Sequence, residues 1–213
     1  MACGQLFANR PMTTGDMATP CYLDHVLDTA HLAPERPRPL RRTEYEQLVE
    51  AGAFTDERIE LLEGVLVSMS PQGTEHADVV SRLTMLFVRL VGDRALVRVQ
   101  CPFAASDDSE PEPDLALVPH GNYRGAHPTR ALLIVEVAES SLRKDSRIKV
   151  DLYARSRVDQ YWIVDLNART VLVHAASDGT TYRRMWSASP ADSLSLDALG
   201  GGALPVIEFL APV

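Results

Sequence analysis

Two acidic residues and one lysine are the residues of this sequence whose types and spacing point most directly to chemistry. Glu136 is the single charge in an apolar run over residues 131–137, and a short run rich in Val and Ile predicts a strand covered on both faces. A carboxylate in such a strand must be paired or must hold a cation, because an isolated buried charge is strongly unfavourable. Asp114 stands at the start of a second predicted strand over residues 113–118, and Lys149 lies on a helix predicted downstream. Two acids on adjacent strands with a lysine are the groups that metal-assisted phosphodiester hydrolysis uses.

The two acids converge if their strands pair with Asp114 beside Glu136. Alternate residues of a strand share one face, so each carboxylate would then point to the same side of the sheet. Like charges that close raise each other's pKa unless a cation lies between them. Oxygen ligands of this kind suit Mg²⁺ or Mn²⁺. We therefore expect Asp114 and Glu136 to be metal ligands, with Mg²⁺ or Mn²⁺ as the cofactor.

The helix after Glu136 is the element that must position the lysine. Asp145, Lys149 and Tyr153 are spaced i, i+4, i+8 and so follow one helix face. We expect the adjacent face, formed by Ile148, Leu152 and the ring of Tyr153, to pack on the sheet. Lys149 then lies at the edge of the packed face, where it can orient water or stabilise charge on a phosphate. The same spacing also fits a plain Asp145–Lys149 helix pair worth a few tenths of a kcal/mol.

Two further polar residues, Glu60 and His76, are weaker candidates. His76 begins a helix predicted over residues 76–90, and a helix N-terminus attracts phosphate. The position also fits an exposed histidine. Glu60 alternates with apolar neighbours on a predicted strand, which is more typical of a solvent-facing residue than of a pocket wall.

Composition limits the class of protein. The 213 residues carry a net charge of −8, which counts against a nucleic-acid partner, because such proteins are usually basic somewhere. Residues 143–157 are locally basic, with six basic and two acidic side chains, although a solvated helix face can have the same composition. Three scattered cysteines without a Cys-x-x-Cys pair argue against structural zinc and for a reduced, cytoplasmic protein. We expect no membrane association, because no apolar run is long enough to span a bilayer and the N-terminus lacks a secretory pattern.

The order of predicted elements indicates an α/β (α+β) domain with a mixed sheet covered by helices. Residues 1–40 read as a flexible tail and linker, and residues 41–213 as one domain. Thr43 is the predicted N-cap of a helix ending near residue 50, and Glu63-Gly64 is the predicted turn of a hairpin over residues 58–69. Further strands are predicted over residues 96–103, 161–165, 171–174 and 181–186.

At these positions the chain resembles the Uma2 (DUF820) family of restriction endonucleases, within the PD-(D/E)xK nuclease superfamily. The resemblance runs from about residue 58 to about residue 182. The matching stretches, in the family's order, are residues 58–65, Ser70-Pro71 followed by His76, residues 110–118, residues 133–137, Ser140-Ser141 followed by the Asp145, Lys149, Tyr153 pattern, and residues 160–165. Each is weak alone, and together in this order they are specific.

The resemblance implies a four-stranded mixed sheet core flanked by helices. It assigns Asp114, Glu136 and Lys149 to the motif's aspartate, second acid and lysine. Ala138 stands where the superfamily motif has its lysine, and Lys149 on the next helix fits a relocated lysine. Glu60 and His76 match the family's other polar positions. The family usually has a Ser-Pro pair after the acidic strand, where this chain has Ala138-Glu139-Ser140. Glu139 is either a third carboxylate of the site or a surface charge.

The sequence therefore predicts a restriction-endonuclease-like domain with an extra N-terminal hairpin and C-terminal strands. The predicted function is a Mg²⁺-dependent endonuclease acting on DNA, with Asp114, Glu136, Lys149, Glu60 and His76 as candidate catalytic residues. A homodimer is plausible, because nucleases that cut both strands often pair. Two alternatives stay open: a non-catalytic nucleic-acid-binding or structural module, and a metal-dependent hydrolase of small phosphate esters.

Overall fold

The computed structural model describes residues 32–211, and the chain divides between Arg38 and Pro39 into two units. Most of the tail predicted over residues 1–40 lies outside the described residues. None of the described helices combines the length and apolar character needed to cross a bilayer. The elements in chain order are α1 Arg42–Glu50, β1 Ile59–Leu62, β2 Val65–Ser68, α2 Thr74–Val91, η2 Gly92–Arg94, β3 Leu96–Val99, β4 Leu115–Val118, β5 Leu133–Ala138, α3 Leu142–Lys144, η3 Asp145–Lys149, α4 Val150–Arg155, β6 Gln160–Asp165, β7 Thr170–Ser177, β8 Tyr182–Ala188, β9 Ser193–Ser195, η4 Asp197–Leu199, β10 Ala203–Pro205 and η5 Val206–Glu208.

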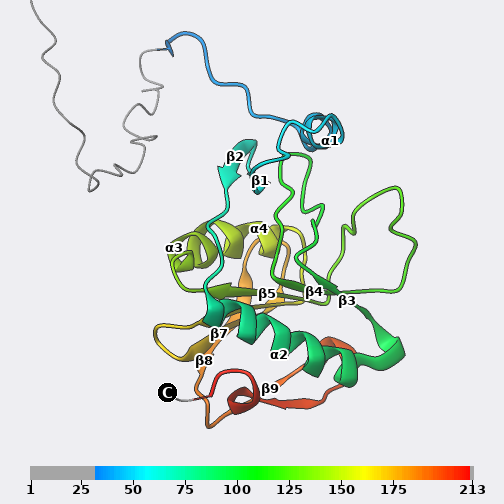
Figure 1. The fold of residues 1–213 in the computed structure, drawn as a ribbon, viewed down its shortest axis with the longest axis vertical. Helices are drawn as coiled ribbons and strands as arrows, with labels where there is room; N and C mark the ends of the chain where they lie inside the picture. The colour runs from blue at the N-terminus through cyan, green and yellow to red at the C-terminus, as the bar shows by residue number, and fades with distance from the viewer. Residues whose placement is uncertain (1–31, 212–213) are drawn as a thin grey trace, which may run out of the picture. The chain divides into compact units, whose positions relative to one another are not determined.

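A six-stranded sheet in the order β3-β4-β5-β6-β7-β8 forms the centre of the second unit (Figure 1). β5 and β6 are parallel, and every other neighbouring pair in this sheet is antiparallel. Parallel neighbours need a crossover connection, which α3, η3 and α4 supply. The mixed sheet with helices confirms the predicted fold class, although it has six strands where the resemblance implied four. The predicted extra hairpin is β1–β2, and the predicted C-terminal strands are the antiparallel pair β7–β8. The short pair β9–β10 was not predicted.

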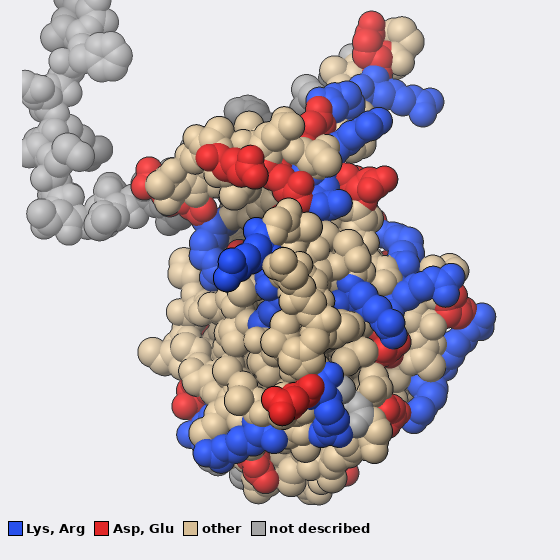
Figure 2. All heavy atoms as spheres, turned by 90° about the vertical axis from the view of Figure 1, so that its right-hand side faces the viewer, with Lys and Arg blue, Asp and Glu red and all other residues tan. Residues whose placement is uncertain are grey.

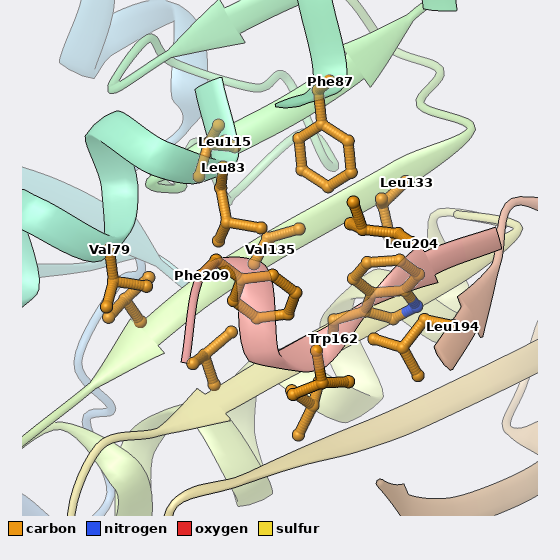
Figure 3. Packing of buried hydrophobic residues seen from close by; sticks show 14 of the residues in the cluster. Val79, Leu83, Phe87, Leu115, Leu133, Val135, Trp162, Leu194, Leu204 and Phe209 are labelled. Carbon is orange, nitrogen blue, oxygen red and sulfur yellow. The ribbon is translucent and has the colours of Figure 1, made fainter. Parts of the chain in front are cut away.

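The larger hydrophobic core lies between α2 and the sheet (Figure 3). The predicted apolar stripe of α2 faces inward, with Leu83 and Phe87 fully buried, while Leu90 is only partly buried. Burying a large apolar side chain contributes roughly 1.5–3 kcal/mol, so this contact fixes α2 on the sheet. The partners shown with α2 in Figure 3 come from β4, β5, β6 and the C-terminal segment: Leu115, Leu133, Val135, Trp162, Leu194, Leu204 and Phe209.

The opposite face of the sheet packs on α4. Ile134 of β5 and Ile163 of β6 belong to a second buried cluster that includes Tyr153 and Ala154 of α4. Successive strand residues point to opposite faces. Glu136 therefore shares the face of Ile134, and its side chain points toward α4 rather than toward α2.

The N-terminal hairpin has the turn that the sequence predicts. Glu63 and Gly64 have φ angles of 49° and 77°, which is the left-handed pair that a type I′ turn requires. Leu61 exchanges two backbone hydrogen bonds with Glu110, at 3.3 and 2.8 Å. The hairpin is thereby attached to the segment that leads into Asp114, and it brings Glu60 to the same region.

The prediction for the start of α1 is wrong by two residues. Arg41 rather than Thr43 is the N-cap. The Glu44 carboxylate accepts a hydrogen bond from the backbone N–H of Arg41 at 2.9 Å, and an acid at this third helical position satisfies an otherwise unpaired donor.

Candidate active site

Asp114 and Glu136 lie opposite each other on neighbouring strands. In the antiparallel pairing of β4 with β5, Leu115 is opposite Val135, so the preceding residue, Asp114, falls opposite Glu136. Both side chains are largely buried, with 8% and 5% of their residue surface exposed. Asp114 Oδ2 accepts a hydrogen bond from the backbone N–H of Val137 at 2.8 Å, which fixes this carboxylate against β5.

Lys149 connects Glu136 to the N-terminal hairpin. Its ammonium group donates to Glu136 Oε1 at 2.8 Å and lies 3.0 Å from Glu60 Oε2. Tyr153, one turn further along, donates its hydroxyl to the same Glu136 oxygen at 2.9 Å. Lys149 is 1% exposed and Glu60 is fully buried. The alternative of a solvent-facing Glu60 is therefore wrong, because the hairpin folds over the lysine.

His76 is also buried rather than exposed. Its Nε2 lies 3.1 Å from Asp114 Oδ2, and the residue is 9% exposed. α2 begins two residues earlier than predicted, at Thr74, so His76 is its third residue. His76 and Val137 thus hold the same oxygen of Asp114.

The helix that carries Lys149 is not a regular α-helix. Residues 145–149 form a π-helical turn between α3 and α4, and such turns are rare and frequent at functional sites. The Asp145–Lys149 helix pair is present, with charged atoms 3.9 Å apart, but it is buried, because both residues are 1% exposed. Asp145 also receives a hydrogen bond from Ser141 at 2.5 Å. Ile148, predicted to pack on the sheet, is instead 43% exposed.

A cavity of about 80 Å³ opens where these groups meet. Asp114, Glu136, Lys149 and His76 line it, while Glu60 lies behind Lys149 and does not. Glu139 is exposed at its edge. Polar residues make up most of the remaining wall, including Ser70, Gln72, Ser140, Ser141 and Lys144, together with the apolar Met69, Pro71 and Val137. Four of the five predicted site residues thus share one pocket, and the fifth supports it from behind.

The cluster holds more acid than base. Burial raises the pKa of Glu136 to about 8, and neighbouring acids, chiefly Asp145, add to the rise while Lys149 opposes it. Burial alone would lower the pKa of Lys149, but the surrounding carboxylates hold it above its ordinary value. Burial alone would likewise raise the pKa of Glu60, but Lys149 and Lys144 hold it below its ordinary value. A further cation beside Glu136 would therefore be stabilised.

The oxygen atoms at the cavity fit a divalent cation. Glu136 Oε1 is used by Lys149 and Tyr153, while Oε2 has no hydrogen-bond partner in the described chain. Asp114 Oδ1 has only a long contact, 3.4 Å from Gln100. Across residues 32–211 no three His, Cys, Asp or Glu side chains enclose a metal by themselves. Mg²⁺ does not need such a cage, because it keeps several waters and binds through one or two carboxylates.

Comparison with known proteins identifies the family and a similar fold. The sequence matches the Uma2 family, described as "Putative restriction endonuclease", over residues 42–206. The chain belongs to the Uma2 family. Its fold is similar to the crystal structure of "a putative nuclease belonging to DUF820" from Anabaena variabilis ATCC 29413, with a TM-score of 0.65 and 15% identity, covering 81% of this chain and 98% of that chain. No curated protein matches the sequence. Membership of Uma2 supports a nuclease role, and the structural likeness supports the fold.

Sequence reasoning missed two contacts of this Uma2 site. Lys144 binds Glu60 Oε1 at 2.6 Å, and the Tyr153 hydroxyl donates to Glu136 Oε1. Lys144 is one of six basic residues over residues 143–157, so the sequence did not single it out as a site residue. One signal was available in the sequence, since Lys144 and Lys149 are its only lysines.

Proposed function

We propose that this protein is a Mg²⁺-dependent endonuclease, also able to use Mn²⁺, that hydrolyses phosphodiester bonds of DNA. One observation carries the proposal. Asp114 and Glu136 lie opposite each other on adjacent strands, face one cavity, and have Lys149 bonded to the second acid. Family membership adds support for the nuclease role.

Each residue has a definite task in this proposal. Asp114 and Glu136 hold the metal, which when bound lowers the pKa of water and stabilises charge on the phosphate. Lys149, held by Glu60, keeps Glu136 in place and supplies positive charge at the phosphate. His76 orients Asp114 through the contact at 3.1 Å.

A DNA substrate would bind through the rim of the pocket. Arg58 and Lys144 line the cavity, and Gly73 caps the N-terminus of the 18-residue α2, where unpaired backbone N–H groups favour phosphate. Basic and acidic side chains are interspersed over the face drawn in Figure 2, so that face offers no continuous basic surface. Each phosphate contact at the rim should make the affinity for DNA fall as salt increases.

The decisive experiment compares the wild type with Asp114→Asn. Mg²⁺ and Mn²⁺ binding is measured by calorimetry, and cleavage of a plasmid is followed with the same samples. We expect the variant to fold, to lose metal binding and to lose cleavage. An active Asp114→Asn protein would rule out this assignment of the metal ligand.

A non-catalytic module is the second candidate, and the ion pairs of Lys149 favour it. Lys149 forms ion pairs with both Glu136 and Glu60, which partly offset their charge, and the net charge of −8 disfavours a large nucleic-acid surface. Such a module would bind no Mg²⁺ at millimolar concentration. A hydrolase of small phosphate esters, the third candidate, would bind the metal but show saturation with a small substrate and little dependence on salt.

A further inference from the structure

The only two lysines of this sequence lie five residues apart. The sequence has 21 basic lysine and arginine side chains, and only Lys144 and Lys149 are lysines. Both contact the same buried carboxylate, Glu60, through different oxygens, at 2.6 and 3.0 Å. A lysine ammonium is a compact charge with three donors, whereas arginine presents a wide planar fork. Two ammonium groups on one carboxylate therefore make a compact positive pair at the pocket.

The π-helical turn makes this shared contact possible. In a regular α-helix, residues five apart project about 140° away from each other. The π-helical turn over residues 145–149 has hydrogen bonds from i to i+5, so Lys144 and Lys149 come to the same side. Glu60 can then accept from both.

The two lysines differ in what they can still bind. Lys149 is 1% exposed and is surrounded by Glu136, Glu60 and Asp145. Lys144 has 24% of its side chain exposed, lines the cavity, and bonds to Glu60 alone among residues 32–211. Two of its three donors therefore meet no acceptor in that described part of the chain, and Lys144 lines the same cavity as Asp114 and Glu136.

We propose that Lys144 binds a non-bridging oxygen of the phosphate that is cleaved, while Lys149 stays on Glu136. Glu60 is then a positioning residue that orders both lysines. This inference rests on the proposed function, because it needs a phosphodiester substrate in the cavity. It assigns substrate binding to a residue other than the predicted Asp114, Glu136 and Lys149.

The first test measures binding of a short DNA duplex as a function of salt, with Ca²⁺ in place of the catalytic metal. The variants are Lys144→Gln, Lys144→Arg and, as a matched control, Arg147→Gln, which removes an equal charge from an exposed position of the same turn. We expect Lys144→Gln to reduce the number of salt-sensitive phosphate contacts by about one. Lys144→Arg should retain that contact, and Arg147→Gln should leave it unchanged.

Cleavage kinetics and chemical labelling give two independent readouts. Loss of one charge-assisted contact should raise the KM of Lys144→Gln roughly tenfold with little change in kcat. Reductive methylation followed by mass spectrometry should label Lys144 and spare the buried Lys149, and the DNA duplex should protect Lys144. A merely structural role for Lys144 would give no protection by DNA.

The possible results separate the two proposals. If the wild type cleaves DNA while Lys144→Gln keeps both its KM and its salt dependence, the lysine assignment is overturned and the nuclease proposal stands. If the wild type binds DNA without cutting it, the nuclease proposal fails and the salt dependence still decides the role of Lys144. A wild type that neither binds nor cleaves DNA overturns both.

Discussion

Replacing Lys149 with methionine should destabilise the protein strongly at neutral and basic pH. The substitution keeps most of the apolar stem but removes the charge that Glu136, Glu60 and Asp145 share, at 2.8, 3.0 and 3.9 Å. Removing one partner of a buried ion pair typically costs about 3–5 kcal/mol, because the remaining charge stays buried without compensation. Lys149 is 1% exposed, so solvent screening does not reduce this figure. We expect a loss of about 3–5 kcal/mol in the free energy of unfolding near pH 8.

The loss should become smaller in acid. In the wild type, burial alone would raise the pKa of Glu60 above 4.5, but Lys149 and Lys144 hold it below that value. This contributes stability above pH 4.5 that is lost as the pH falls through the lowered pKa. Without Lys149 the pKa of Glu60 rises, and Glu136, already raised to about 8, rises further. The folded variant then binds protons more tightly than the unfolded chain, so it gains stability relative to the wild type as the pH falls from about 8 toward 5.

Urea denaturation followed by circular dichroism at pH 8 and pH 5.5 measures both effects. Arg147→Met, at an exposed position of the same turn, is the control and should change stability by less than about 0.5 kcal/mol. A Lys149→Met protein as stable as the wild type at pH 8 would refute the reasoning. An equal destabilisation at both pH values would show that packing, rather than charge, is what the lysine contributes.

Three other changes test the fold. Phe87→Ala removes a fully buried ring whose centroid is 5.9 Å from that of Trp162, and urea denaturation should show a loss of about 3–5 kcal/mol. Gly64→Ala places a Cβ 2.3 Å from Cβ of Pro39 at a φ of 77°, so thermal unfolding should reveal a loss of about 1 kcal/mol or more; unchanged stability would mean that this turn is not constrained. Burial and the neighbouring Glu46 raise the pKa of Glu110 to about 7, and an acid raised in the folded state loses stability as the pH rises from about 4.5 through 7. Glu110→Gln should therefore raise the melting temperature at pH 8 but not at pH 4.5, and an equal effect at both would contradict the pKa shift.

Local patterns predicted the elements because local chemistry decides them. The turn at Glu63-Gly64 follows from a glycine, which adopts positive φ without strain, placed between two short apolar runs. The apolar stripe of α2 follows from a 3.6-residue period. Glu136 could be singled out because a charge within an apolar strand is unfavourable unless it has a partner. These features need no knowledge of distant segments.

The partners of that charge were decided only by tertiary structure. Glu60 is 84 residues from Lys144 along the chain, and His76 is 38 residues from Asp114, so no local period links them. Pairing of β4 with β5, packing of α2 and attachment of the hairpin to Glu110 together bring these residues to one cavity. The 3.6-residue pattern does not predict the π-helical turn at residues 145–149, because that pattern assumes a regular α-helix. Contacts with distant segments, including Glu60, stabilise the turn. The sequence alone thus determined which residues carry charge into the core, and the tertiary structure decided which of them meet, because the energy that pairs distant segments is absent from any short stretch of chain.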